Sequence, residues 1–337
     1  MEDTNTNIDV SIDINEKNID IEDDIEKKSP KLFKHMVLSG GGPVGFIFIG
    51  IIQQLHMKKY WNMNELISIY GTSIGAIIGC IICIMGDDWD VINKYLTERP
   101  WHKLFEIKPS NLMNIFNNKG VYDGKLLMLE FFKPLLKSKH LELSITMKEL
   151  YNFCNIDLHI FSCNINNNFD TIDISHDTYP DLEVITALSM TSSLPGIVQP
   201  IFYKDGCYVD GGATCPYPIY HCKKKYICDN SDITSDIYDN ILGIRLKEND
   251  NINYTCLESN TTLEYFMNLA HISLQYLRYN SDKINGFIEN TENLIKYTII
   301  VPNDIDAMSI KTMEEVSKSQ ELRKQLINRG INYDIKL

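Results

Sequence analysis

The sequence contains no hydrophobic run long enough to cross a bilayer. Its longest uncharged apolar run, from Ile74 to Met85, has twelve residues, whereas a membrane-spanning helix needs about 20. The N-terminus is acidic, not basic and then apolar, so it lacks the pattern of a secretory signal peptide. We therefore expect a buried helix at 74–85 and no transmembrane segment.

Cysteines do not form the pattern of a disulfide framework. There are nine, an odd number scattered over 337 residues, which favours free thiols in a reducing compartment. We expect a protein that is cytoplasmic or intracellular in a host cell, with peripheral membrane contact left open. Cys80 and Cys83 form a C-x-x-C pair inside the apolar run without a matching second pair, which favours core packing over zinc. A second group also matches no zinc spacing: Cys207, Cys215, Cys222, Cys228 and His221.

Clustered basic residues are also lacking. The net charge is −13, of which residues 1–30 carry −7. Nucleic acid is therefore excluded as the main partner, because phosphate contacts need clustered Lys and Arg. The run Lys223–Lys225 lies in a polar stretch, 222–240, that predicts a surface loop. Its lysines are either solvated or in contact with anionic lipid heads.

The first 30 residues predict a disordered acidic tail, followed by one domain over 31–337. The tail has no aromatic residue and ends at Ser29-Pro30, so it can bury little apolar surface. Alternation of Ile8, Val10, Ile12 and Ile14 leaves strand addition to a partner as the alternative.

Two successive units of strand, glycine loop and helix begin the domain. Strands at 35–39 and 66–70 each precede a glycine loop and an apolar helix, which predicts parallel strands joined by right-handed crossovers. A mostly helical part, 88–150, follows. Further strands are predicted at 158–165, 169–175, 201–203, 207–209, 240–247 and 296–302.

The first glycine loop has two interpretations. Its glycines are Gly40, Gly41, Gly42 and Gly45. They satisfy the dinucleotide fingerprint G-x-G-x-x-G, but the second strand ends in Tyr70-Gly71-Thr72-Ser73, without the acidic residue that holds a ribose hydroxyl. Glycines before a helix also expose backbone N–H groups suited to an oxyanion.

The second loop matches G-x-S-x-G, with Ser73 between Gly71 and Gly75. This pattern is typical of the strained strand-to-helix turn that lifts a nucleophilic serine into an active site. The required strand before it and helix after it are both predicted. We therefore interpret Ser73 as a nucleophile.

A nucleophilic serine needs a proton acceptor, and two schemes are available. A triad of Ser73, Asp210 and His271 is disfavoured, because His271 borders a helical apolar stripe. In a dyad, Asp210 takes the serine proton directly. It stands at a predicted strand end, and Gly211 and Gly212 allow close backbone approach.

At this point the sequence resembles the patatin-like phospholipases. That family joins a glycine-rich oxyanion loop, a G-x-S-x-G serine and a D-G-[GA] aspartate in the same order. The resemblance implies a three-layer α/β/α sandwich with a mainly parallel central sheet. It also implies residues 40–45 as the oxyanion loop, Ser73 as nucleophile and Asp210 as base. Weaker similarities lie at 120–124, 191–195 with Pro200, and 217–219.

Two positions depart from the family pattern. Val44, preceded by Pro43, stands where the loop usually carries Arg or Lys, which puts phospholipid preference in question. Pro216 replaces the usual asparagine after the aspartate, which affects the expected orientation of the Asp210 loop.

The resemblance implies a lipid acyl hydrolase, a phospholipase A-type esterase that works through an acyl-enzyme. It needs no metal or other cofactor, and its substrate is a phospholipid or another acyl ester at a membrane surface, with an activating partner left open. The same dyad permits acyl transfer to another alcohol. A catalytically silent scaffold or nucleotide-binding module that uses residues 40–45 is the alternative from another class.

Overall fold

The structure is a computed structural model of the chain. It describes residues 31–106, 117–229, 237–247, 255–260, 265–266, 268–269, 272–276, 297–305, 310–335 and 337. The predicted acidic tail and His271 lie outside these residues. Within them, no helix is long and apolar enough to cross a membrane.

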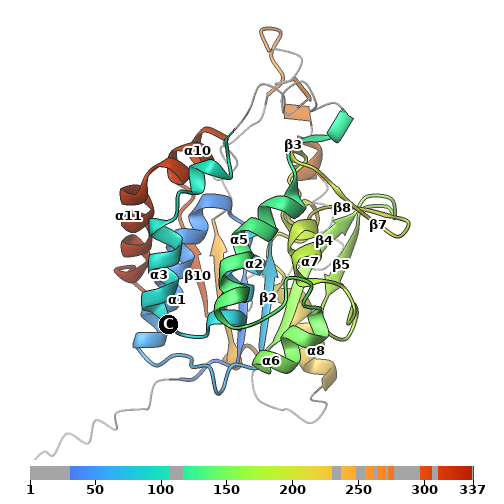
Figure 1. Cartoon of the computed structure of the whole chain (residues 1–337). Helices are drawn as coiled ribbons and strands as arrows, with labels where there is room; N and C mark the ends of the chain where they lie inside the picture. The colour runs from blue at the N-terminus through green and yellow to red at the C-terminus, as the bar shows by residue number, and fades with distance from the viewer. Residues whose placement is uncertain are drawn as a thin grey trace, which may run out of the picture.

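A mixed sheet of eight strands forms the centre of the described residues, in the order β10-β9-β1-β2-β4-β8-β7, with β5 paired to β4 (Figure 1). The strands are β1 (His35–Leu38), β2 (Ser68–Thr72), β4 (Asp157–Asn164), β5 (Asp170–Ile174), β7 (Ile201–Tyr203), β8 (Gly206–Asp210), β9 (Ile241–Leu246) and β10 (Thr298–Val301). Strands β10, β9, β1, β2 and β4 pair in parallel, whereas β5 and β8 run antiparallel to β4. Strands β3 (Gly120–Tyr122) and β6 (Gly196–Val198) form a separate parallel pair.

Helices cover both faces of this sheet. They are α1 (Gly45–Met57), α2 (Ile74–Met85), α3 (Trp89–Glu98), α5 (Gly124–Ser138), α6 (Met147–Cys154), α7 (Val184–Thr191), α8 (Ile219–Asp229), α10 (Ile310–Lys318) and α11 (Gln320–Ile331). Short 3₁₀ turns are η1 (Gly42–Val44), η2 (Trp101–Lys103), η3 (Gly211–Ala213) and η4 (Ile237–Asn240). The Asp123 carboxylate accepts from the Leu126 amide at the start of α5, at 3.0 Å, which caps that helix.

Side chains alternate between the two faces of the sheet. In β1, Met36 and Leu38 join the main apolar cluster with α1 and α2, whereas Val37 packs with Ile219 of α8. Because both faces of these strands are buried, they read as continuous apolar runs, as parallel strands usually do. The arrangement is the predicted three-layer α/β/α sandwich with a mainly parallel sheet.

Helix α2 lies in the middle of the main cluster. All of its residues except Ile74 are buried, including Cys80 and Cys83, whose thiols are free. This confirms the prediction that residues 74–85 form a buried helix and that the C-x-x-C pair packs in the core.

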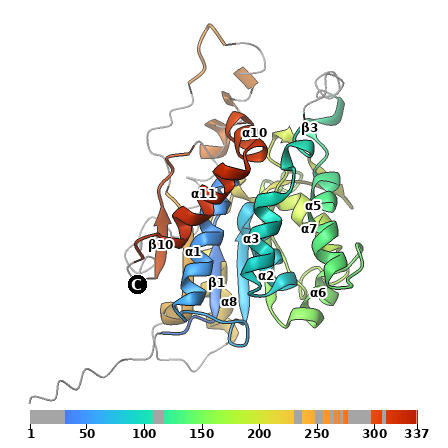
Figure 2. The ribbon, with the colours of Figure 1, turned by 60° about the vertical axis from the view of Figure 1, so that its left-hand side comes forward.

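Helices α1 and α11 approach each other through glycine. A Cβ atom at Gly50 would lie 2.1 Å from the Ile327 carbonyl oxygen, and one at Gly330 would lie 2.1 Å from the Ile47 carbonyl oxygen. In Figure 2 these two helices lie side by side with α3. The C-terminal helix therefore completes the layer that α1 begins.

The prediction of a surface loop from residue 222 onward is wrong for its first part, because α8 continues through Asp229. Ile219 and Cys222 are buried three residues apart, so one side of α8 packs on the sheet while Lys224 is exposed. Lys225 pairs with Asp157 at 2.9 Å and with Asp177 at 3.1 Å. The polar composition of this stretch suggested a loop, although the spacing of Ile219 and Cys222 is that of a helix.

Candidate active site

Ser73 occupies a sharp turn between β2 and α2. Its backbone has φ 53° and ψ −122°, a conformation that a residue with a side chain rarely adopts. Both flanking glycines are required, since a Cβ at Gly71 would lie 2.5 Å from the Ala76 nitrogen and one at Gly75 2.4 Å from the Leu38 carbonyl oxygen. The Ser73 hydroxyl makes no capping bond to α2.

The structure brings Ser73 and Asp210 together from positions 137 residues apart. Ser73 Oγ donates to Asp210 Oδ2 at 2.7 Å. Asp210 ends β8, and its register places it opposite Ser162 on β4, which neighbours β2, the strand that leads into Ser73. Asp210 is 8% exposed, and its Oδ1 accepts from the Gly212 amide at 2.7 Å. The carboxylate is therefore oriented by its own loop, with Oδ2 directed at the serine.

Close approach also explains the glycine after Asp210. A Cβ at Gly211 would lie 2.1 Å from the Phe161 carbonyl oxygen of β4. Any side chain there would push the Asp210 loop away from the sheet. Gly211 thus permits the short turn, and Gly212 supplies the amide that holds the carboxylate.

The first glycine loop lies against the serine. A Cβ at Gly40 would be 3.6 Å from Ser73 Cβ. The Gly40 amide donates to the Pro216 carbonyl oxygen at 2.9 Å, and the Gly45 amide bonds within η1, so neither is available to a ligand. Of the four glycines predicted for an oxyanion loop, the amides of Gly41 and Gly42 make no hydrogen bond with any residue that the structure describes.

The two departures from the family pattern have structural roles. Val44 is 0% exposed and packs in the main apolar cluster, so this position offers no charge to the site. The Pro216 carbonyl oxygen accepts a hydrogen bond from the Gly40 amide, which links the Asp210 segment to the glycine loop. A proline in place of asparagine is compatible with this bond, because only the backbone oxygen takes part.

Thr191 supports the serine and was not identified from the sequence as a site residue. Its hydroxyl accepts from the Ser73 amide at 2.9 Å and donates to the Phe161 carbonyl oxygen. It is fully buried at the end of α7. Two residues later, the Ser193 carbonyl oxygen accepts from the Asp210 amide at 2.9 Å. Only the resemblance at 191–195 hinted at this segment, since no periodicity marks it.

A buried charged cluster lies at the other end of β4. His159 is 1% exposed, and its ring stacks on Tyr70 with centroids 4.2 Å apart. Burial alone would lower the pKa of His159, but hydrogen bonds to Asp157 at 3.0 Å and Asp173 at 2.7 Å raise the pKa to about 9. The cationic form is therefore the stable one in the folded protein at neutral pH.

Because of this cluster, we expect the free energy of unfolding to fall at alkaline pH. Because the His159 pKa is raised from 6.5 to about 9, its stabilising effect is complete below about pH 6.5 and is lost as the pH rises through about 9. The loss amounts to on the order of 3 kcal/mol in the free energy of unfolding. Urea unfolding of wild type between about pH 7 and 10 measures it. A His159→Gln variant should be less stable at pH 7 with a flatter profile, and equal slopes for the two proteins would contradict the assignment.

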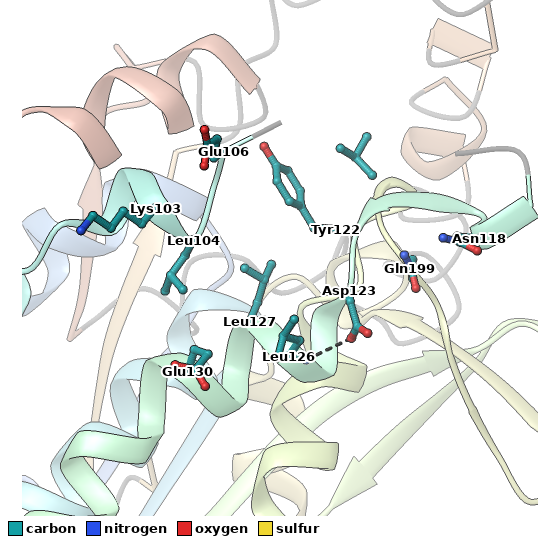
Figure 3. A pocket seen from close by; sticks show the side chains of 11 residues that line it. Lys103, Leu104, Glu106, Asn118, Tyr122, Asp123, Leu126, Leu127, Glu130 and Gln199 are labelled. Carbon is teal, nitrogen blue, oxygen red and sulfur yellow. Dashed lines mark hydrogen bonds between the residues drawn. The ribbon is translucent and has the colours of Figure 1, made fainter. Parts of the chain in front are cut away.

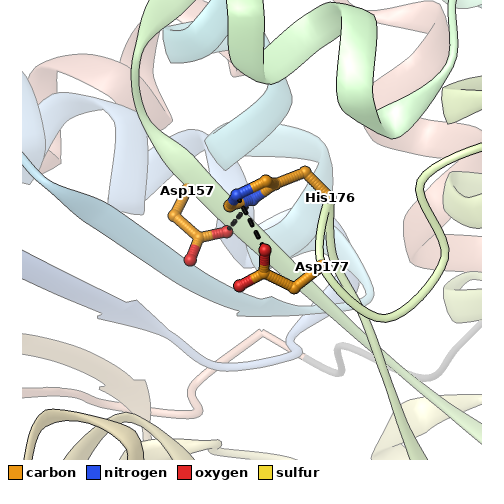
Figure 4. Close-up of side chains that lie close together, drawn as sticks. All are labelled: Asp157, His176 and Asp177. Atoms are coloured by element: carbon orange, nitrogen blue, oxygen red, sulfur yellow. Dashed lines mark hydrogen bonds and ion pairs between the residues drawn. The ribbon is translucent and has the colours of Figure 1, made fainter. Parts of the chain in front are cut away.

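One group of side chains in the described residues has the geometry for a metal ion. Ligand atoms of Asp157, His176 and Asp177 lie within 4.8 Å of one another (Figure 4). The Lys225 ammonium contacts both carboxylates and offsets part of their charge. Asp157 lies five residues before Ser162 on β4, which puts it roughly 16 Å along the strand from the dyad.

A cavity of about 260 Å³ lies beside β3 and the start of α5 (Figure 3). Its lining is both apolar and charged, and it includes neither Ser73 nor Asp210. The lining residues are Lys103, Leu104, Glu106, Asn118, Val121, Tyr122, Asp123, Leu126, Leu127, Glu130 and Gln199. The predicted motif at 120–124 therefore forms β3, the cap of α5 and one wall of this cavity.

Fold and geometry together define a three-layer α/β/α protein with a serine–carboxylate pair next to a glycine loop. Residues 36–222, more than half of the chain, match the family model described as patatin-like phospholipase. The chain belongs to the patatin-like phospholipase family.

The individual proteins that the chain resembles share less than 30% of its residues in the aligned regions. The chain is 29% identical over 204 residues to the probable lipid hydrolase 463L of Invertebrate iridescent virus 6, covering 58% of this chain and 67% of that protein. It is 27% identical over 194 residues to an uncharacterized protein of Acanthamoeba polyphaga mimivirus, covering 58% and 63%. Among solved structures, VipD from Legionella pneumophila aligns over 89% of this chain and 67% of its own, with 17% identity and a TM-score of 0.43.

Proposed function

We propose that this protein is a lipid acyl hydrolase of the phospholipase A type, with Ser73 as nucleophile and Asp210 as base. The 2.7 Å contact between Ser73 Oγ and Asp210 Oδ2 at a strained turn carries this proposal. A serine on such a turn is exposed to substrate and has its proton acceptor already in place. Membership of a phospholipase family, and the name of the iridescent virus relative, support a lipid ester as substrate.

In the first half-reaction, Ser73 Oγ bonds to the ester carbonyl carbon while Asp210 Oδ2 takes the proton of the Ser73 hydroxyl. The amides of Gly41 and Gly42 donate to the oxyanion that forms. Collapse of this intermediate breaks the bond to the alcohol, which leaves with the proton returned from Asp210. An acyl-enzyme on Ser73 remains.

In the second half-reaction, Asp210 takes a proton from water, whose oxygen attacks the acyl carbon. The second tetrahedral intermediate uses the same amides, and the bond to Ser73 Oγ breaks as the serine regains a proton from Asp210. The fatty acid leaves and the dyad is restored. The N-terminus of α2 at Ser73 adds positive potential where negative charge develops in both steps.

Acyl transfer to another alcohol uses the same steps, with the acceptor in the place of water.

The eight described cysteines form no disulfide, which agrees with the proposed location in a reducing, intracellular compartment. The chain covers only about two thirds of the two viral relatives, so the activity proposed is that of this chain.

A fluorophosphonate probe and two substrates test the proposal. We expect the probe to label wild type and not Ser73→Ala, and wild type to hydrolyse a short-chain p-nitrophenyl ester and phosphatidylcholine vesicles. Glycerol is added as a competing acceptor: free fatty acid as the main product indicates hydrolysis, and acylglycerol as the main product indicates acyl transfer. Equal labelling of both proteins contradicts Ser73 as nucleophile. An unlabelled wild type whose melting temperature rises with nucleotide would favour the binding-module alternative.

A further inference from the structure

Helical residues described between positions 265 and 276 expose large apolar side chains. In the residues that the structure describes, 265–266, 268–269 and 272–276 are helical. The outer apolar face is the set of exposed residues Tyr265, Phe266, Leu269, Ile272 and Tyr276, whose exposed fractions run from 36% to 68%. The Tyr265 and Phe266 rings contact each other, with centroids 5.5 Å apart.

The helical spacing puts this face opposite a buried anchor. Within the continuous helical stretch 272–276, Ile272 and Tyr276 lie one turn apart on the same side, and position 274 falls on the other side. Leu274 is buried, as that geometry requires. A surface helix has a polar outer side, so a helix that is apolar on both sides needs a second apolar environment.

The anchor attaches this helical segment to the residues that flank Asp210 in the chain. Leu274 packs in a cluster with Cys163, Val209 and Ala213. Val209 precedes Asp210 in β8, and Ala213 ends the turn that follows it. In Figure 1 the orange segment lies at the same end of the molecule as β3.

Charge is absent along this segment. Residues 265–276 contain no Asp, Glu, Lys or Arg, in a chain where these residues make up 23%. The segment therefore meets no electrostatic cost from neutral lipid heads, and it gains nothing from anionic ones. Tyrosines at both ends of the face have the apolar ring and polar tip that suit the boundary between acyl chains and head groups.

We propose that the outer apolar face inserts into the surface of a zwitterionic lipid bilayer and holds the Ser73–Asp210 pair at the depth of the ester groups. This inference rests on the proposed function. A bilayer is favoured over a protein partner because the substrate of the adjacent site is itself a component of that surface. Since the contact is apolar, its strength should scale with buried apolar area and depend little on salt.

Binding is measured with the full chain carrying Ser73→Ala, so that hydrolysis does not alter the vesicles. We expect this protein to cosediment with phosphatidylcholine vesicles, equally at about 0.1 and about 0.5 M NaCl. Adding Phe266→Glu and Tyr276→Glu should weaken binding by at least about tenfold. The matched control adds Met57→Glu and Phe153→Glu, which are also exposed apolar residues but lie at the ends of α1 and α6, away from the site. The control should bind like its parent.

The same pairs of changes are then compared in the chain that retains Ser73. We expect the outer-face variant to lower the ratio of vesicle to soluble-ester hydrolysis by at least about tenfold, and the control pair to leave it unchanged. The proposal is overturned if the Ser73→Ala chain does not bind vesicles, or if both pairs weaken binding equally. It is also overturned if the face instead mediates a dimer seen by sedimentation, or if hydrolysis of both substrates falls together. Because the binding measurement needs no catalysis, it stands even if the esterase assignment fails.

Discussion

Asp210→Asn is expected to lower turnover of a soluble ester by about 10²–10⁴-fold while the protein remains folded. The asparagine amide keeps the shape of the carboxylate, and its oxygen can still accept from the Gly212 amide. It cannot take the proton of Ser73, because a neutral amide is a very weak base. Steady-state kinetics on a p-nitrophenyl ester and a melting curve measure the two quantities.

The control for this change is Asp205→Asn, in the exposed turn between β7 and β8. It makes the same chemical change and should leave turnover within about twofold of wild type. The double variant Ser73→Ala with Asp210→Asn should be no slower than Ser73→Ala alone, since the two residues act as a unit. An Asp210→Asn protein with wild-type turnover would show that another group is the base.

Gly50→Ala is expected to lower the free energy of unfolding by about 3 kcal/mol or more, at the upper end of the cost of overpacking. The added methyl would lie 2.1 Å from the Ile327 carbonyl oxygen and 2.8 Å from the Gly330 Cα atom, both of them backbone. Backbone cannot yield by changing a rotamer, so α1 and α11 must separate and lose packing along their contact. Urea unfolding measures the change.

Gly330→Ala tests the same contact from the other helix and should cost a similar amount. The two costs should not add, because one separation of the helices relieves both overlaps. Lys324→Ala supplies the control on α11, where an exposed side chain is shortened and an effect within about 0.5 kcal/mol is expected. Additive losses would indicate that the glycines act independently and not through one close approach.

Local patterns in the sequence determined the elements that carry the site. The apolar runs before the two glycine loops predicted β1 and β2, and the turn at Ser73 followed from G-x-S-x-G in that context. The hairpin at 201–209 also followed from its turn residues. These features depend on neighbours along the chain, where backbone geometry and residue type limit the choices.

Only the tertiary structure decided which distant groups meet. The contact between Ser73 and Asp210 depends on the antiparallel register of β4 and β8, and the bond from the Ser73 amide depends on where α7 ends at Thr191. The occupied amide of Gly40 likewise depends on Pro216, far along the chain. Register and strand order follow from the packing of whole layers, which no local pattern records. The sequence by itself determined the serine turn and named Asp210 as its partner, and the packing of the sheet against its helices brings the two side chains within 2.7 Å.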